Sequence, residues 1–111
     1  MRDALSRLLE MKGYNVETAA DGHRALGMLR GGVQPCLILL DIDMARRAAY
    51  RFRKQLLKDP QLAAIRLVVY SGIYEPSIAA AQLRATAYIK TPFDVDQLLQ
   101  VIETYCQRRA A

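Results

Sequence analysis

The feature that most constrains this chain is an unbroken apolar run, CLILL, which covers residues 36–40 and ends on Asp41. An apolar run without polar alternation is typical of a strand in a parallel sheet, where helices cover both faces. Asp43 follows two residues later. Asp41 is therefore either a reactive carboxylate at the end of a buried strand or only the polar residue that ends it. The run alone leaves both interpretations open.

Strand-like and helix-like segments alternate along the whole chain. Periodicity and turn residues predict strands over residues 14–18, 36–40, 67–70 and 87–90. A first helix is predicted around Leu5, Leu8 and Leu9 and should end at Gly13. Four further helices are predicted over residues 21–30, 45–58, 76–84 and 95–105. Asp21 and Asp94 are the expected N-caps of the second and the last helix, and Asp59-Pro60 should end the helix over 45–58. Strict alternation predicts an α/β fold, a three-layer sandwich with helices on both faces of a parallel sheet.

The composition fits one globular domain over residues 1–111, with 52% hydrophobic residues and a net charge of +5. No apolar run reaches the roughly 18 residues that span a bilayer. Residues 1–13 carry charges throughout, unlike a signal peptide. Cys36 and Cys106 have no metal-site spacing, and we expect them to be reduced in a cytoplasmic protein. Nothing in the pattern points to an independent enzyme or to a membrane partner.

Polar residues follow several of the predicted strands. Asp41, Ser71 and either Lys90 or Thr91 each come at the carboxyl end of a strand. In open parallel sheets, ligands bind beyond these ends. A functional site is therefore expected there, although Ser71 also suits a turn before Gly72.

Four motifs occur in order: GYNVETAADGHRALGMLR, LILLDIDM, VVYSG and AYIKTPF. In this combination the chain resembles the receiver domain of two-component response regulators, which has a flavodoxin-like fold. The resemblance implies phosphorelay signalling, with a sensor histidine kinase or phosphotransfer protein as partner. It implies that Asp41 is the phosphoacceptor, that Ser71 contacts the phosphoryl group and that Tyr88 is the aromatic switch residue. It further implies Mg²⁺ held in part by Asp41 and Asp43, and a cis peptide at Thr91-Pro92.

The sequence departs from the family pattern at several positions. The family's first strand, with the acidic pair that holds Mg²⁺, is missing before the first predicted helix. Thr91 stands in the place of the family's lysine, and Lys90, one residue earlier, should point away from Asp41. Ala45 and Ala49 replace proline and glycine after the acceptor, so the following helix should begin early. Arg84 stands where glycine is usual.

These departures predict that Asp41 reacts poorly and that Mg²⁺ binding is doubtful. The alternative function is a pseudo-receiver, which binds a protein partner without being phosphorylated. In that case Asp41 is a strand-end carboxylate and Tyr88 a half-buried aromatic residue of its strand.

A basic stripe is predicted on the helix over 45–58. It consists of Arg47, Arg51, Lys54 and Lys58, broadened by Arg46 and Arg53. Such a stripe can bind nucleic acid or an acidic protein surface. Because no aromatic interleaving and no known DNA-reading motif supports that function, we favour a solvated helix face over a nucleic-acid-binding domain.

The missing strand would lie between the strands that contain Val16 and Ile38. Its loss leaves a gap that cannot stay empty, because backbone groups buried there need hydrogen-bond partners. Either the two strands close directly on each other, or two chains associate through the exposed edges. We expect self-association, since the 36–40 strand is too apolar to serve as an edge.

Overall fold

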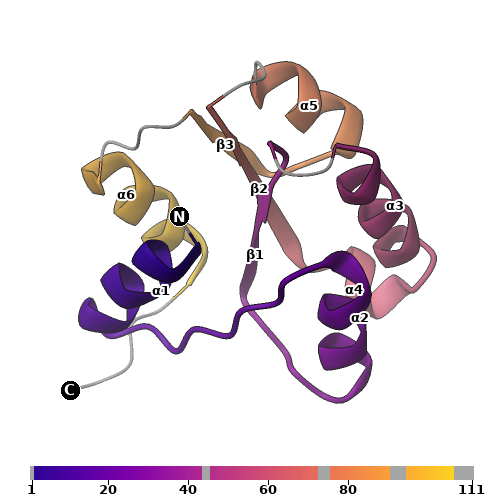
Figure 1. Ribbon diagram of the computed structural model, residues 1–111, viewed down its shortest axis with the longest axis horizontal. Coiled ribbons are helices and arrows are strands. Elements are labelled where there is room, and N and C mark those ends of the chain that lie inside the picture. Colours follow the sequence, from indigo (N-terminus) through magenta and orange to yellow (C-terminus); the bar gives the residue numbers. More distant parts are fainter. Residues whose placement is uncertain (1, 44–45, 73–75, 91–94, 107–111) are drawn as a thin grey trace.

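The computed structural model describes residues 2–43, 46–72, 76–90 and 95–106. Its sheet consists of β1 (Leu37–Asp41), β2 (Arg66–Ser71) and β3 (Ala87–Lys90), all parallel, in the order β1-β2-β3 (Figure 1). The helices are α1 (Arg2–Met11), α2 (Gly22–Arg30), α3 (Arg46–Leu57), α4 (Pro60–Ala63), α5 (Pro76–Leu83) and α6 (Val95–Tyr105). The predicted α/β architecture with a parallel sheet is confirmed.

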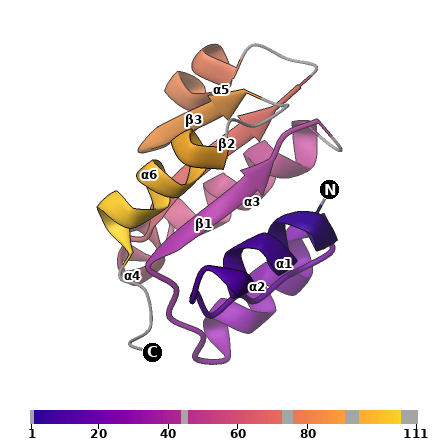
Figure 2. The same ribbon diagram turned by 90° about the vertical axis from the view of Figure 1, so that its left-hand side faces the viewer.

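Helices cover both faces of the sheet, so the domain has three layers. Figures 1 and 2 show α1 and α6 side by side on one face, with the remaining helices on the other. On the first face, Leu5 and Leu98 pack with Val68 and Tyr70 of β2. On the second face, apolar side chains of α3 and α5 pack against alternate residues of the same strand, including Val69. β2 is therefore the centre of the core, and its apolar residues are almost fully buried.

Most predicted elements are confirmed within one or two residues. The N-cap Asp21 accepts a hydrogen bond from the Arg24 amide at 2.8 Å, as a helix start requires. Gly13 has a φ of 94°, which suits the glycine that ends α1. The prediction of an early helix after β1 is confirmed, because α3 begins at Arg46 and Ala49 is buried within it. The predicted cap Asp94 and the Thr91-Pro92 peptide lie outside the described residues.

The predicted strand over residues 14–18 is wrong. These residues are extended but unpaired, and in the described sheet β1 pairs only with β2. The physical reason is that a strand needs a neighbour, and the family's first strand would have been that neighbour. Tyr14 and Val16 instead pack against the core cluster beneath α1 and α6. Direct closure of Val16 onto Ile38 as paired strands is therefore wrong as well, and β1 is an edge strand.

The prediction of reduced cysteines is also wrong for this structure, because Cys36 and Cys106 form a disulfide with Cα atoms 5.6 Å apart. Cys36 directly precedes β1 and Cys106 directly follows α6. The two elements meet in one core cluster, which brings residues 70 positions apart together.

Among the described helices, none is both long and apolar enough to cross a membrane.

Candidate functional site

Asp41 is the last residue of β1, and its carboxylate is used locally. Its Oδ1 accepts a hydrogen bond from the Asp43 backbone N–H at 2.9 Å. An aspartate that accepts from the amide two residues on forms an Asx turn. The chain therefore bends sharply after β1, and this bend carries the Asp43 side chain toward the end of β2.

The Asp43 carboxylate is the centre of the polar cluster at this edge. It accepts a hydrogen bond from the Ser71 hydroxyl through Oδ1, and one from the Gly72 backbone N–H at 2.7 Å through Oδ2. Ser71 is fully buried, so its hydroxyl requires such a partner. Asp43 thus joins the carboxyl ends of β1 and β2, a role that the sequence patterns did not predict. The position of Asp43, two residues after the end of the strand, is the sequence signal for this role, but the family resemblance implied only a metal ligand there.

The strand register separates Asp41 from Ser71. Asp41 pairs with Tyr70, and Ser71 pairs with Lys90. Because successive side chains alternate between the faces of a strand, Asp41 lies on the Tyr70 face and Ser71 on the opposite one. Lys90 is exposed on the Ser71 face, which agrees with the prediction that it points away from Asp41. Thr91 lies outside the described residues.

The family implies Mg²⁺ at this position, but the described side chains do not fit it. Asp41 and Asp43 are the two acids that sequence reasoning assigned to the metal, and one Asp43 oxygen faces Ser71 while the other faces Gly72. In the described part of the chain, no group of three acidic, histidine or cysteine side chains could hold a metal ion. Mg²⁺ needs near-octahedral oxygen ligands, and these two carboxylates supply few free ones.

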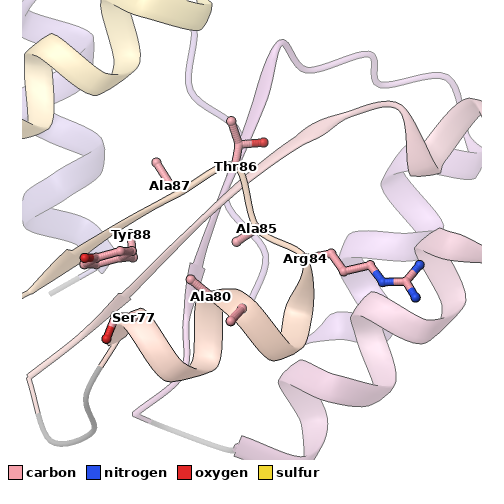
Figure 3. Close-up of a pocket in the computed structure, with 8 residues that line it drawn as sticks. Ser77, Ala80, Arg84, Ala85, Thr86, Ala87 and Tyr88 are labelled. Carbon is pink, nitrogen blue, oxygen red and sulfur yellow. The ribbon is translucent and has the colours of Figure 1, made fainter.

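Tyr88 lies on the exposed surface of β3. Its side chain is 48% exposed and lines a shallow groove between α5 and β3. Figure 3 shows Tyr88 and Ser77 at one end of this groove and Arg84 at the other. The structure therefore leaves Tyr88 accessible at a surface, on the same face of the sheet as Ser71.

The basic stripe predicted along α3 is exposed, except for one of the residues expected to broaden it. Arg47, Arg51, Lys54 and Lys58 are exposed, whereas Arg53 is buried and does not broaden the stripe. The side chain of Arg46 lies outside the described ones. Arg53 follows Ala49 by four residues and precedes Leu56 by three, so helical spacing already placed it on the inward face.

Arg53 instead contacts the end of α5. Its Nε donates to the Leu83 carbonyl at 2.8 Å and its Nη2 to the Arg84 carbonyl at 3.0 Å. Desolvation, and then the positive charge of Arg84, lower the pKa of Arg53. Arg53 is therefore a structural cation that links α3 to α5.

A parallel sheet between helices, with polar residues gathered at the carboxyl ends of its strands, defines the chain as an α/β domain of the flavodoxin-like type. Residues 1–103 match the model of the response regulator receiver domain, and the chain belongs to this family. It is a receiver domain of two-component signal transduction.

Curated relatives are transcription regulators. The chain is 30% identical over 108 residues to a protein described as DNA-binding dual master transcriptional regulator RpaA of Synechocystis, covering 96% of this chain and 44% of that protein. It is 32% identical over 104 residues to the transcriptional regulatory protein CpxR of Escherichia coli, covering 94% of this chain and 44% of CpxR. The chain thus spans less than half the length of these relatives.

Solved structures agree with the fold. The receiver domain of NtrX from Brucella abortus superposes with a TM-score of 0.78 at 27% identity, over 94% of this chain and 88% of that one. The receiver domain of the sensor histidine kinase PA1611 from Pseudomonas aeruginosa superposes with a TM-score of 0.80 at 16% identity, over 94% of this chain and 86% of that one. That structure has a magnesium ion coordinated in its active-site cleft.

Proposed function

We propose that this receiver domain takes part in phosphorelay signalling with Asp41 at the acceptor position, and that Asp41 reacts slowly. Transfer of a phosphoryl group is promoted by positive charge and hydrogen-bond donors aimed at its oxygens. The observation that carries the proposal is the pairing of Asp43 with both Ser71 and Gly72. These two donors already have an anionic partner, and Ser71 lies on the face opposite to Asp41.

The proposed partner is a sensor histidine kinase or a phosphotransfer protein, as the family suggests, and the proposed location is the cytoplasm. Mg²⁺ would bind weakly if Asp41 and Asp43 were its only acidic ligands. The regulators CpxR and RpaA suggest transcription as the output of a longer protein, and this too is a proposal.

The test is incubation of the chain with acetyl phosphate and Mg²⁺, followed by intact-mass spectrometry. We expect little or no gain of a phosphoryl group in the wild-type chain. Asp41→Asn is the control that removes the phosphoacceptor carboxylate, and Asp43→Ala removes the carboxylate that accepts from the Ser71 hydroxyl and the Gly72 amide. A large phosphorylated fraction in the wild-type chain that disappears in Asp41→Asn would contradict slow reaction at Asp41.

The second candidate is a pseudo-receiver that binds its partner without phosphorylation. One observation favours it: the Asp43 carboxylate gives Ser71 and Gly72 an anionic hydrogen-bond acceptor without any added group. In that case Asp41→Asn would leave partner binding unchanged, whereas a phosphorylation-dependent receiver would lose it. The basic stripe on α3 offers nucleic acid a surface, but nothing about these residues favours that function over solvation.

Self-association is part of the proposal for either function. In the described sheet β1 has a strand partner on one side only, and Leu37, Ile38, Leu39 and Leu40 are each partly exposed. A short apolar edge of this kind invites pairing with another strand. We therefore propose that a second copy of this chain covers β1.

A further inference from the structure

The two cysteines of the chain join its edge strand to its last helix. Cys36 is the residue before β1, and Cys106 is the residue after α6. β1 carries Asp41 at its other end. The disulfide therefore holds the start of the strand whose end forms the polar cluster.

The two cysteines differ in exposure. Cys36 is exposed, whereas Cys106 is 7% exposed and packs with Leu9, Leu99 and Ile102. Thiol–disulfide exchange requires a thiolate to reach a sulfur atom, so access decides which sulfur is attacked. Of the two, Cys36 is the accessible one, and Cys106 is the buried partner that leaves and returns.

A cation lies beside both neighbours of the pair. Arg66 pairs in register with Leu37, the residue after Cys36. Its guanidinium carbon is 5.1 Å from the ring centroid of Tyr105, the residue before Cys106. The same contact keeps β2 close to α6 without the disulfide, so that the reduced cysteines stay near each other.

We propose that Cys36 and Cys106 form a reversible redox modification site that exchanges with small aliphatic thiols and disulfides of the glutathione class. In the reducing direction, an external thiolate attacks Cys36 Sγ and forms a mixed disulfide. Cys106 leaves as a thiolate and takes a proton from water. A second external thiolate attacks the external sulfur of the mixed disulfide, which releases Cys36. The sum is two external thiols oxidised to one disulfide and one protein disulfide reduced to two thiols.

The structural consequence concerns β1 and α6. β1 has a strand neighbour on one side only within the described sheet. Its other attachments include the packing of Leu37 and Leu39 on the α1 and α6 face and the disulfide at its start. Reduction removes the covalent link and loosens β1 together with the last turn of α6. α5 packs on the opposite face of the sheet and should not respond.

The experiment equilibrates the whole chain in buffers with different ratios of reduced to oxidised glutathione, traps free thiols with a maleimide and measures intact mass. We expect the protein to pass from disulfide to dithiol within the series. Cys106→Ser, which leaves Cys36 alone, should form the glutathione adduct at least tenfold faster than Cys36→Ser. Cys106→Ala serves as a second version, because alanine places no hydroxyl in the apolar cluster.

Amide hydrogen exchange on the oxidised and reduced wild-type chain supplies the structural readout. Reduction should speed exchange at least tenfold in residues 37–41 and 102–105 and leave α5 within twofold. Three results would each overturn the proposal: a wild-type chain that stays entirely oxidised or entirely reduced throughout the series, equal adduct rates for the two single variants, or exchange in β1 that ignores reduction.

Discussion

Replacement of Arg53 by methionine should destabilise the domain, although the change removes a buried charge. α5 ends at Leu83, and the last carbonyls of a helix have no partner within it. Arg53 supplies donors for the Leu83 and Arg84 carbonyls at 2.8 and 3.0 Å. Methionine keeps the aliphatic volume of the side chain but supplies neither donor.

The magnitude follows from three contributions. Two hydrogen bonds from a charged donor contribute about 3–6 kcal/mol together, at about 1.5–3 kcal/mol each. Removal of the buried cation relieves its desolvation, which is the first cause of the lowered pKa of Arg53. The carbonyl of the exposed residue Arg84 can also regain water. We therefore expect the free energy of unfolding to fall by about 2–4 kcal/mol.

Urea unfolding followed by far-ultraviolet circular dichroism measures this difference. Arg51→Met is the matched control, since Arg51 is exposed on the same helix and its loss should change stability by less than about 0.5 kcal/mol. Arg53→Lys should fall between the two, because lysine keeps the charge but lacks the planar fork of donors. If Arg53→Met were as stable as Arg51→Met, the assignment of Arg53 as the cap of α5 would be refuted.

Arg84 has a φ of 54°, in the left-handed region, where a residue other than glycine costs about 1–2 kcal/mol. Glycine relieves this strain but loses about 0.5–1 kcal/mol more conformational entropy on folding. Arg84→Gly should therefore stabilise the domain by about 0.5–1 kcal/mol, and Arg84→Ala should not. The unpaired edge of β1 predicts a dimer or larger oligomer, which light scattering at micromolar concentration would detect. A stable monomer with cooperative unfolding would contradict the proposal of self-association.

The sequence predicted those elements that local patterns control. Three of the four expected strands and the starts of α2, α3 and α5 follow from apolar runs, from the N-cap Asp21 and from Pro76. The extended segment around Val16 did not form a strand, because strand formation depends on a neighbour that local propensity does not supply. Strand pairing is a tertiary property, and the pattern at Val16 could not report it.

The sequence predicted where the candidate residues lie, but not their contacts. The carboxyl ends of the strands were the expected place, and Asp41, Asp43 and Ser71 do lie there. The partner of Ser71 depends on the turn after β1, whose geometry is set by the Asp41 side chain. The disulfide depends on the meeting of the start of β1 with the end of α6. Neither contact leaves a mark in spacing along the sequence.

The central claim is that Asp43, and not Asp41, holds the donors at the end of β2. Two-dimensional ¹H–¹⁵N spectra with amide exchange at Gly72 test it directly in the wild-type chain, Asp43→Ala and Asp41→Ala. A charge-assisted hydrogen bond of about 1.5–3 kcal/mol corresponds to roughly tenfold or more in exchange rate. We predict that the Gly72 amide shifts and exchanges at least that much faster in Asp43→Ala. The change should be smaller in Asp41→Ala, which loosens the turn after β1 but keeps the Asp43 carboxylate. A Gly72 amide that responds to Asp41→Ala and ignores Asp43→Ala would contradict the account.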